Sequence, residues 1–210
     1  MLLKNRKDPT AFLSDARGGS KEALGSLLEL YRNYLHLLAR TQIDLHLKKQ
    51  VHPSDLVQDT FLEAYRDFGQ FRGKTPAEFR AWLRRILVHN IARLVEKHVK
   101  AQKRDLRREA SLQSRIESLE RSSASFEAAL LSPWNSPAVK EEKQELATIL
   151  ADHLAQLPEN YREVIVLRNF EGLPFKEVAE RMELTSGAVR ILWLRALDRL
   201  KQALEREDLI

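Results

Sequence analysis

Hydrophobic residues recur at helical spacing along most of the chain, while the strict alternation of a half-buried strand is almost absent. Such spacing collects the apolar side chains on one face of each helix. The pattern predicts helices over residues 9–16, from Ser20 along a stripe that reaches Leu38, over 53–68, and from about Ala77 onward. Helical spacing returns at Ala138 and continues to Leu204, so we expect an all-α protein.

The pattern is sharpest between residues 175 and 204, where it predicts a helix-turn-helix. A short helix over 175–182 is followed by a turn at 182–184 and by a longer helix that opens at Thr185 or Ser186. Thr185 suits the cap of the longer helix, because its hydroxyl can accept from free backbone N–H groups. The turn departs from its usual form, since it has Glu183 where Gly would adopt a positive φ more easily.

The longer helix of this motif has two different sides. Its buried stripe is expected to comprise Val189, Leu192, Trp193, Ala196, Leu197, Leu200 and Leu204. Away from this stripe lie Ser186, Arg190, Ile191, Leu194 and Arg195. Arginine reaches phosphates and guanine edges, so this helix is a candidate reader of duplex DNA. The alternative is a helical hairpin that packs on another part of the protein.

The helix over 53–68 also has two faces. The side chains expected to point inward are Leu56, Val57, Thr60, Phe61, Ala64 and Phe68. The other face carries Asp55, Gln58, Asp59, Leu62 and Glu63. A hydrophobic Leu62 among acidic side chains is suited to docking a basic partner helix, whereas the alternative is an ordinary solvated face.

Positive charge is concentrated rather than spread along the chain. The net charge is +5, and the stretch 93–108 accounts for the same excess with seven Lys or Arg and two acidic residues. Trp82 precedes this stretch on the helix that begins near Ala77, and the basic residues along that helix include Arg84, Arg85, Arg93, Lys97 and Lys100. Interleaved aromatic and basic side chains suit single-stranded nucleic acid. The alternatives are a solvated basic face and a tryptophan in the core.

Composition changes between residues 111 and 137, where eight serines and two prolines occur. Such a stretch is typical of a linker. We therefore expect two helical domains, at 1–105 and 138–210, joined by a linker at 106–137.

Patterns of catalytic and metal sites are missing from the sequence. Cysteine is absent and the six histidines show no paired-ligand spacing. Gly73-Lys74-Thr75 resembles the end of a phosphate-binding loop, but neither the earlier glycine nor a preceding strand is present. No apolar run approaches the ~18 residues of a membrane span, and the first residues lack a signal-peptide core. We expect a cytoplasmic protein without cofactor, metal, membrane segment or enzymatic activity.

Four sequence blocks resemble the extracytoplasmic-function (ECF) sigma factors of bacterial RNA polymerase. The blocks DLVQDTFLEAYRDFGQFRG (55–73) and EFRAWLRRIL (78–87) resemble region two of that family. The blocks LPENYREVIVLRNFEGLPFKEVAERMEL (157–184) and SGAVR (186–190) resemble region four. The likeness covers about residues 9–100 and 138–204. The sequence GAVRILWLRAL also resembles a branch common among planctomycete-type sigma factors.

The resemblance implies a factor that binds core RNA polymerase, recognises a promoter and melts its −10 element. Core contacts, on the β′ clamp helices, carry over to Asp55, Gln58, Asp59 and Leu62, and the β flap is a second expected partner. Contacts to the −10 element carry over to Phe71, Arg72, Lys74, Trp82, Arg85, His89, Asn90, Arg93 and Lys97. Contacts to the −35 element carry over to Thr185, Ser186, Arg190, Ile191, Leu194 and Arg195. Regulation by an anti-sigma factor or by the linker stays open.

The sequence departs from the family pattern at two places. The family often has Asn where this chain has His89, and Asn90 follows, so either residue is a candidate for the base pocket. The family's Ser and Arg after the first basic residue of the reading helix are replaced by Ile191 and Leu192. Ile191 and Leu194 are suited to thymine methyl groups. The alternative function is a helix-turn-helix regulator that binds duplex DNA by itself, as a dimer.

Overall fold

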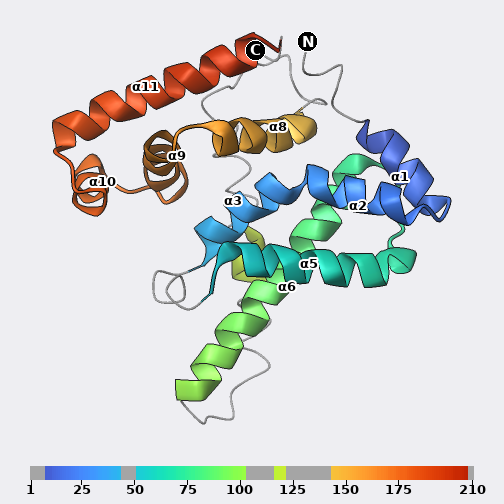
Figure 1. Ribbon diagram of the computed structural model, residues 1–210. Helices are drawn as coiled ribbons and strands as arrows, with labels where there is room; N and C mark the ends of the chain where they lie inside the picture. The colour runs from blue at the N-terminus through green and yellow to red at the C-terminus, as the bar shows by residue number, and fades with distance from the viewer. Residues whose placement is uncertain (1–7, 44–50, 103–115, 122–142, 208–210) are drawn as a thin grey trace. The chain divides into compact units, whose positions relative to one another are not determined.

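The computed structural model describes residues 8–43, 51–102, 116–121 and 143–207, and every regular element in these ranges is a helix (Figure 1). The all-α prediction is therefore confirmed. Contacts divide the described helices into two compact units, α1 to α6 and α8 to α11. Most of the stretch 106–137, where we place the linker, lies outside the described residues, as does the basic stretch from 103 to 108. No helix in the described ranges is long and apolar enough to cross a membrane.

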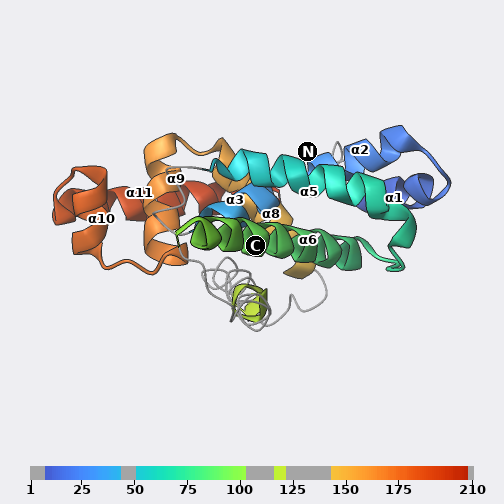
Figure 2. The same cartoon turned by 90° about the horizontal axis from the view of Figure 1, so that it is seen from below.

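The N-terminal unit contains α1 (Pro9–Arg17), α2 (Lys21–Leu30), α3 (Arg32–Gln42), α5 (Pro53–Asp67) and α6 (Pro76–Gln102). A short 3-10 turn, Phe68–Gln70, follows α5. Helix α5 packs against α3 and α6 (Figure 2). The core between these helices is apolar, and its fully buried members include Tyr34, Leu38, Val57, Phe79, Leu83 and Leu87.

The prediction of one long helix after Ser20 is wrong, because the chain leaves helical geometry at Tyr31. There φ is −102° and ψ is 2°, and α2 ends where α3 begins. Tyr31 is buried, and its hydroxyl donates to the carbonyl of Pro76, 45 residues away, at 3.2 Å. The hydrophobic stripe continues through the break, so helical periodicity alone does not reveal it.

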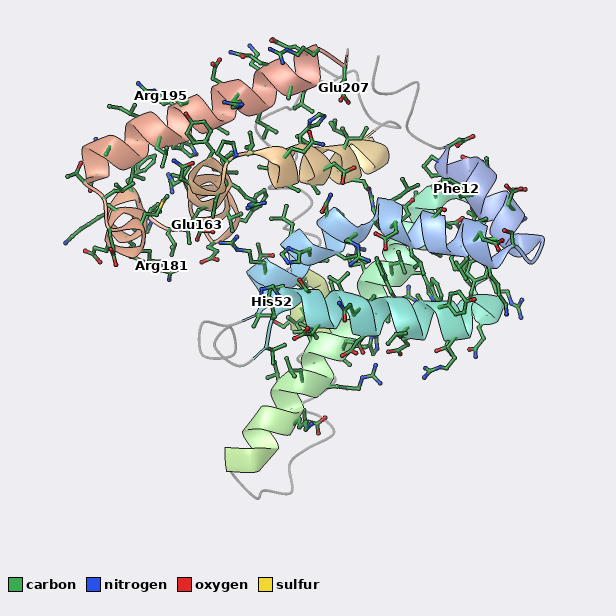
Figure 3. The ribbon with its side chains drawn as sticks, in the orientation of Figure 1. Phe12, His52, Glu163, Arg181, Arg195 and Glu207 are labelled. Carbon is green, nitrogen blue, oxygen red and sulfur yellow. The ribbon has the colours of Figure 1, made fainter. Side chains whose placement is uncertain are left out.

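The C-terminal unit contains α8 (Lys143–Gln156), α9 (Glu159–Ile165), α10 (Phe175–Met182) and α11 (Ser186–Glu205). A π-helical turn, Val166–Phe170, extends α9 and was not predicted. Helix α11 packs on α9 and α10. Of its predicted buried stripe, Val189, Ala196, Leu200 and Leu204 are buried, whereas Leu192, Trp193 and Leu197 are half-buried. Near the end of α11 the His153 Nε2 atom lies 3.3 Å from the Glu207 carboxylate, which links α8 to the last residues described (Figure 3).

The turn of the helix-turn-helix has the predicted form. Glu183 follows α10 in the left-handed region, with φ 55° and ψ 40°. It is the only non-glycine residue with positive φ in the described ranges. The hydroxyl of Thr185 accepts from the Ala188 N–H at 3.2 Å and caps α11. The sequence thus meets the backbone requirement of this turn without the glycine that would satisfy it most easily.

Glu183→Gly is therefore expected to stabilise the protein by about 0.5–1 kcal/mol, because a side chain in the left-handed region is strained, although glycine gains entropy in the unfolded chain. Urea unfolding measures this change. Glu180→Gly is the matched control: Glu180 is exposed within α10, and glycine there should destabilise by about 1 kcal/mol. Equal destabilisation by both changes would contradict strain at Glu183.

Candidate polymerase and nucleic-acid interfaces

The outer face of α5 is acidic with an apolar centre. Asp55, Gln58 and Asp59 are exposed, and Leu62 is 71% exposed. Tyr65, 44% exposed one turn after Leu62, extends this face although the sequence did not single it out. The sequence could have indicated Tyr65, because residues three apart on a helix lie on the same face. An exposed leucine and tyrosine beside two carboxylates form a surface with both hydrophobic and electrostatic means of holding a partner helix.

Glu63 does not belong to this outer face, contrary to the sequence prediction. It is half-buried and accepts a hydrogen bond from the Arg93 guanidinium at 2.7 Å. Position 63 is turned toward α6 because α5 and α6 pack side by side. The Glu63–Arg93 pair joins α5 to α6. It also neutralises part of the positive charge of Arg93, which is a predicted −10 contact.

Four aromatic side chains gather where the 3-10 turn and its following loop meet α6. Phe71 lies 5.1 Å from Trp82 and 5.4 Å from Phe79, measured between ring centroids, and Phe68 is 6.1 Å from Phe71. Phe79 is buried, whereas Phe71 and Trp82 are half-buried. The structure thus brings two predicted −10 residues together, and each of them is partly exposed.

The loop from Phe71 to Thr75 is hydrogen bonded at its end to the start of α6. The Glu78 carboxylate accepts from the N–H groups of Lys74 and Thr75 at 2.7 and 2.9 Å, and from the Thr75 hydroxyl at 3.0 Å. In return, the Thr75 hydroxyl accepts from the Glu78 N–H at 3.2 Å, which completes a capping box. The backbone N–H donors of Lys74 and Thr75 lower the pKa of Glu78, so the carboxylate is charged at neutral pH. The Arg72 and Lys74 side chains are exposed beside this cap.

A hollow of about 390 Å³ lies against α6 next to the aromatic cluster. Its lining includes Trp82, Arg85, His89 and Arg93 and also two carboxylates, Glu63 and Asp67. Asn90 does not line it, since its amide donates to the buried Thr60 hydroxyl at 3.2 Å. Of the two neighbouring candidates for the base pocket, His89 therefore has the side chain at the hollow. Lys97 is exposed further along α6.

The outward face of α11 has an apolar centre between two arginines. Ile191 and Leu194 are 54% and 59% exposed, and Arg190 and Arg195 are exposed as well. Successive helical residues turn by about 100°, which places Ile191 and Leu194 about 60° apart and each arginine about 40° further out. Leu192, also a departure from the family pattern, is half-buried and belongs to the inner stripe. Ser186 is half-buried in the first turn, and exposed Thr185 precedes it as the cap.

Arg190 lies beside an aromatic side chain from the preceding helix. Its guanidinium carbon is 5.5 Å from the centroid of Phe175, and the Arg168 guanidinium is 4.8 Å from the same ring. Trp193 packs edge-on against Phe175 at 5.6 Å. A guanidinium over an aromatic ring gains about 0.5–1 kcal/mol at an exposed site, which favours this rotamer of Arg190. Sequence reasoning missed Arg168 and Phe175 as its supports, because they lie far from it in the chain.

Two further features surround the helix-turn-helix: an ion pair on α10 and a hollow beside Arg195. Arg181 near the end of α10 donates to Glu171 at 2.7 Å, which ties α10 to the segment before it (Figure 3). Arg195, labelled on α11 in the same figure, borders a hollow with Tyr161, Arg199 and Arg206. Within the described ranges no group of His, Asp and Glu is arranged to hold a metal ion.

Comparisons with known proteins match both units. Residues 27–104 match the family described as Sigma-70 region 2, and residues 148–200 match Sigma-70, region 4. The ECF RNA polymerase sigma-E factor of Haemophilus influenzae is 29% identical over 93% of this chain and 94% of its own. The ECF RNA polymerase sigma-E factor of Escherichia coli is 33% identical over 143 residues, or 68% of each chain. A solved structure, CnrH in complex with the cytosolic domain of CnrY, aligns over 95% of this chain and 99% of that one, with 24% identity and a TM-score of 0.32.

Proposed function

Because the chain belongs to the extracytoplasmic-function sigma factors, as its identity to the sigma-E factors shows, we propose that its two helical units hold polymerase and the two promoter elements. The protein is a transcription initiation factor, and its proposed role needs no catalysis. The observation that carries the proposal is the joint presence of a helix-turn-helix and of an N-terminal unit with an acidic outer face on α5 and a hollow lined in part by Trp82, Arg85 and His89. A simple DNA-binding regulator needs only the helix-turn-helix.

The outer face of α5 is proposed as the contact with the β′ clamp helices of core polymerase. Leu62 supplies buried apolar area in the complex, and Asp55 and Asp59 supply charge complementary to a basic helix. Gln58 lies between them and offers hydrogen bonds. The β flap is the partner proposed for the C-terminal unit on family grounds alone.

The hollow on α6 is proposed to receive an unpaired base of the −10 element. Trp82, with the Phe71 ring packed against it, offers a ring face for stacking, and His89 offers a ring nitrogen at the lining. Arg72, Lys74, Arg85, Arg93 and Lys97 are the proposed phosphate contacts. Asn90 takes a supporting role instead, because its amide is bonded to Thr60. Extruding a base costs a few kcal/mol, which such contacts offset.

The outward face of α11 is proposed to read the −35 element in the major groove. Arg190 and Arg195 reach base edges or phosphates, and Thr185 and Ser186 lie at the helix N-terminus, where backbone N–H groups favour a phosphate. Ile191 and Leu194 are proposed to contact thymine methyl groups. Side chains three apart are about 5–6 Å from each other, whereas bases rise about 3.4 Å per step. The two therefore fit methyl groups one or two steps apart.

Replacing thymine by uracil at each −35 position in turn is expected to weaken holoenzyme binding about fourfold where Ile191 or Leu194 contacts the methyl, since burying one carbon contributes ~0.8 kcal/mol. Competition binding at fixed salt measures the effect. Ile191→Ser is the matched variant: the uracil effect should vanish at one position and persist at the other. A uracil effect that is the same in both proteins would remove Ile191 from methyl recognition.

We propose further that the protein acts in the cytoplasm, that residues 106–137 link domains at 1–105 and 138–210, and that an anti-sigma factor is its regulator. These proposals follow from family membership and from the composition of the serine-rich stretch. Assignment to the planctomycete-type branch rests on the sequence GAVRILWLRAL and stays a prediction.

Selection of DNA from a random duplex library distinguishes this function from that of a regulator acting alone. With core polymerase present, the chain should enrich two sequence blocks at a fixed spacing. Without core it should enrich little. If the free chain instead enriches palindromic sites, and core polymerase adds nothing, the chain acts as a helix-turn-helix regulator and the sigma proposal fails.

A further inference from the structure

The loop that carries Phe71, Arg72 and Lys74, three proposed contacts to the −10 strand, is held by a side chain of α1. Arg17, the last residue of α1, donates from its guanidinium to the carbonyl of Gly73, 56 residues later. The guanidinium carbon of Arg17 also lies 5.8 Å from the centroid of the Phe71 ring. One exposed side chain therefore touches both the backbone and the aromatic residue of this loop.

A second tie comes from the break between α2 and α3. The Tyr31 hydroxyl donates to the Pro76 carbonyl at 3.2 Å, and its ring lies 5.8 Å from that of Phe79. Tyr31 is 4% exposed, so this hydroxyl is fixed by the packing of its ring. The carbonyls at both ends of the segment from Gly73 to Pro76 thus accept from side chains of the N-terminal helices.

Gly73 shows how closely the loop is folded down. A Cβ at this position would come within 2.5 Å of the Phe71 ring and 2.8 Å of the Glu78 Cβ. A larger residue fits only if both the Phe71 ring and the Glu78 Cβ shift from their places. Together with the Glu78 capping box, these contacts define one conformation of the loop before DNA arrives.

We propose that Arg17 and Tyr31 are positioning residues, which hold the loop from Phe71 to Thr75 ready for the unpaired −10 strand. The inference rests on the proposed function of this loop. Binding that must also order a loop loses affinity through the entropy of ordering. A loop already fixed by α1 and by Tyr31 avoids that loss at the moment of melting. Arg17 acts through Phe71 and Gly73 and makes no DNA contact of its own.

Capture of a fluorescent single-stranded −10 oligonucleotide by the reconstituted holoenzyme tests this role. Arg17→Met, which keeps a long side chain without the charge or donors, is expected to weaken capture about tenfold. Arg17→Lys restores a cation and a donor and should recover most of it. Tyr31→Phe removes one hydroxyl and keeps the ring, so a loss of about threefold is expected. Affinity for core polymerase should stay unchanged in all three variants.

Salt dependence separates positioning from direct contact. If Arg17 bound a phosphate, Arg17→Met would make the log–log salt slope of capture shallower by about 0.7; positioning predicts an unchanged slope. A shallower slope, an equal loss of core affinity, or wild-type capture by Arg17→Met would each overturn the inference. Wild-type capture by Arg17→Met would overturn only the positioning role. A wild-type holoenzyme that captures no −10 strand would overturn the proposed function as well.

Discussion

Asp59→Arg is expected to weaken binding to core RNA polymerase by roughly 2–4 kcal/mol, because it places a like charge against a basic partner helix. Asp59 is exposed at the middle of the outer face of α5, next in line to the 71% exposed Leu62. Its side chain lies outside the inner stripe of α5, so the substitution should leave the fold intact. Titration of labelled protein with core polymerase measures the affinity, and circular dichroism checks the fold.

Asp15→Arg is the control for this change, because it reverses an exposed charge on α1 and alters the net charge equally. It should leave core affinity within a few tenths of a kcal/mol, as surface changes away from an interface usually do. Equal losses from both variants would point to a general charge effect. Unchanged affinity in Asp59→Arg would remove α5 from the polymerase interface.

Arg190→Ala is expected to cost roughly 1–3 kcal/mol at one position of the −35 element, if its guanidinium makes a bidentate contact with a guanine. The side chain is exposed, and Phe175 beside it limits the conformations to be lost on binding. Competition among promoters that differ at single −35 positions measures the discrimination. The effect should appear as a relaxed preference at one base pair.

Arg199→Ala removes the same charge from the same helix and serves as the comparison. Arg199 is exposed one turn beyond Arg195, where a contact to phosphate would weaken every promoter to the same degree. If Arg190→Ala also weakens all promoters equally, then Arg190 binds phosphate and the −35 specificity lies in other side chains.

Most helices were predictable because each has a continuous apolar stripe and clear terminal signals. Thr185 caps α11 as its position before the stripe predicts, and Ser20 caps α2 in the same way. The break at Tyr31 was not predictable, since the residue continues the stripe, and its hydroxyl is bonded to Pro76, which is distant in the chain. Hydrophobic periodicity predicts which face of a helix is buried, but it does not predict contacts with residues that are distant in the chain.

The same limit applies to the proposed sites. The exposure of Ile191 and Leu194 followed from their place outside the stripe of α11, and the structure agrees. The choice between His89 and Asn90 did not follow, because neighbouring residues differ by contacts with another helix, here the bond from Asn90 to Thr60. The role of Arg17 was not predictable either, because Phe71 and Gly73, which it contacts, are distant from it in the chain. The roles of these residues in binding stay predictions.

Run-off transcription with core polymerase, from a promoter obtained by the selection described above, tests the central claim most directly. The chain and core together should give a transcript of defined length, and neither alone should give one. Loss of the transcript is expected when either selected block is scrambled. If no selected promoter is transcribed while the free chain binds duplex DNA tightly, then the chain does not direct initiation and the account is wrong.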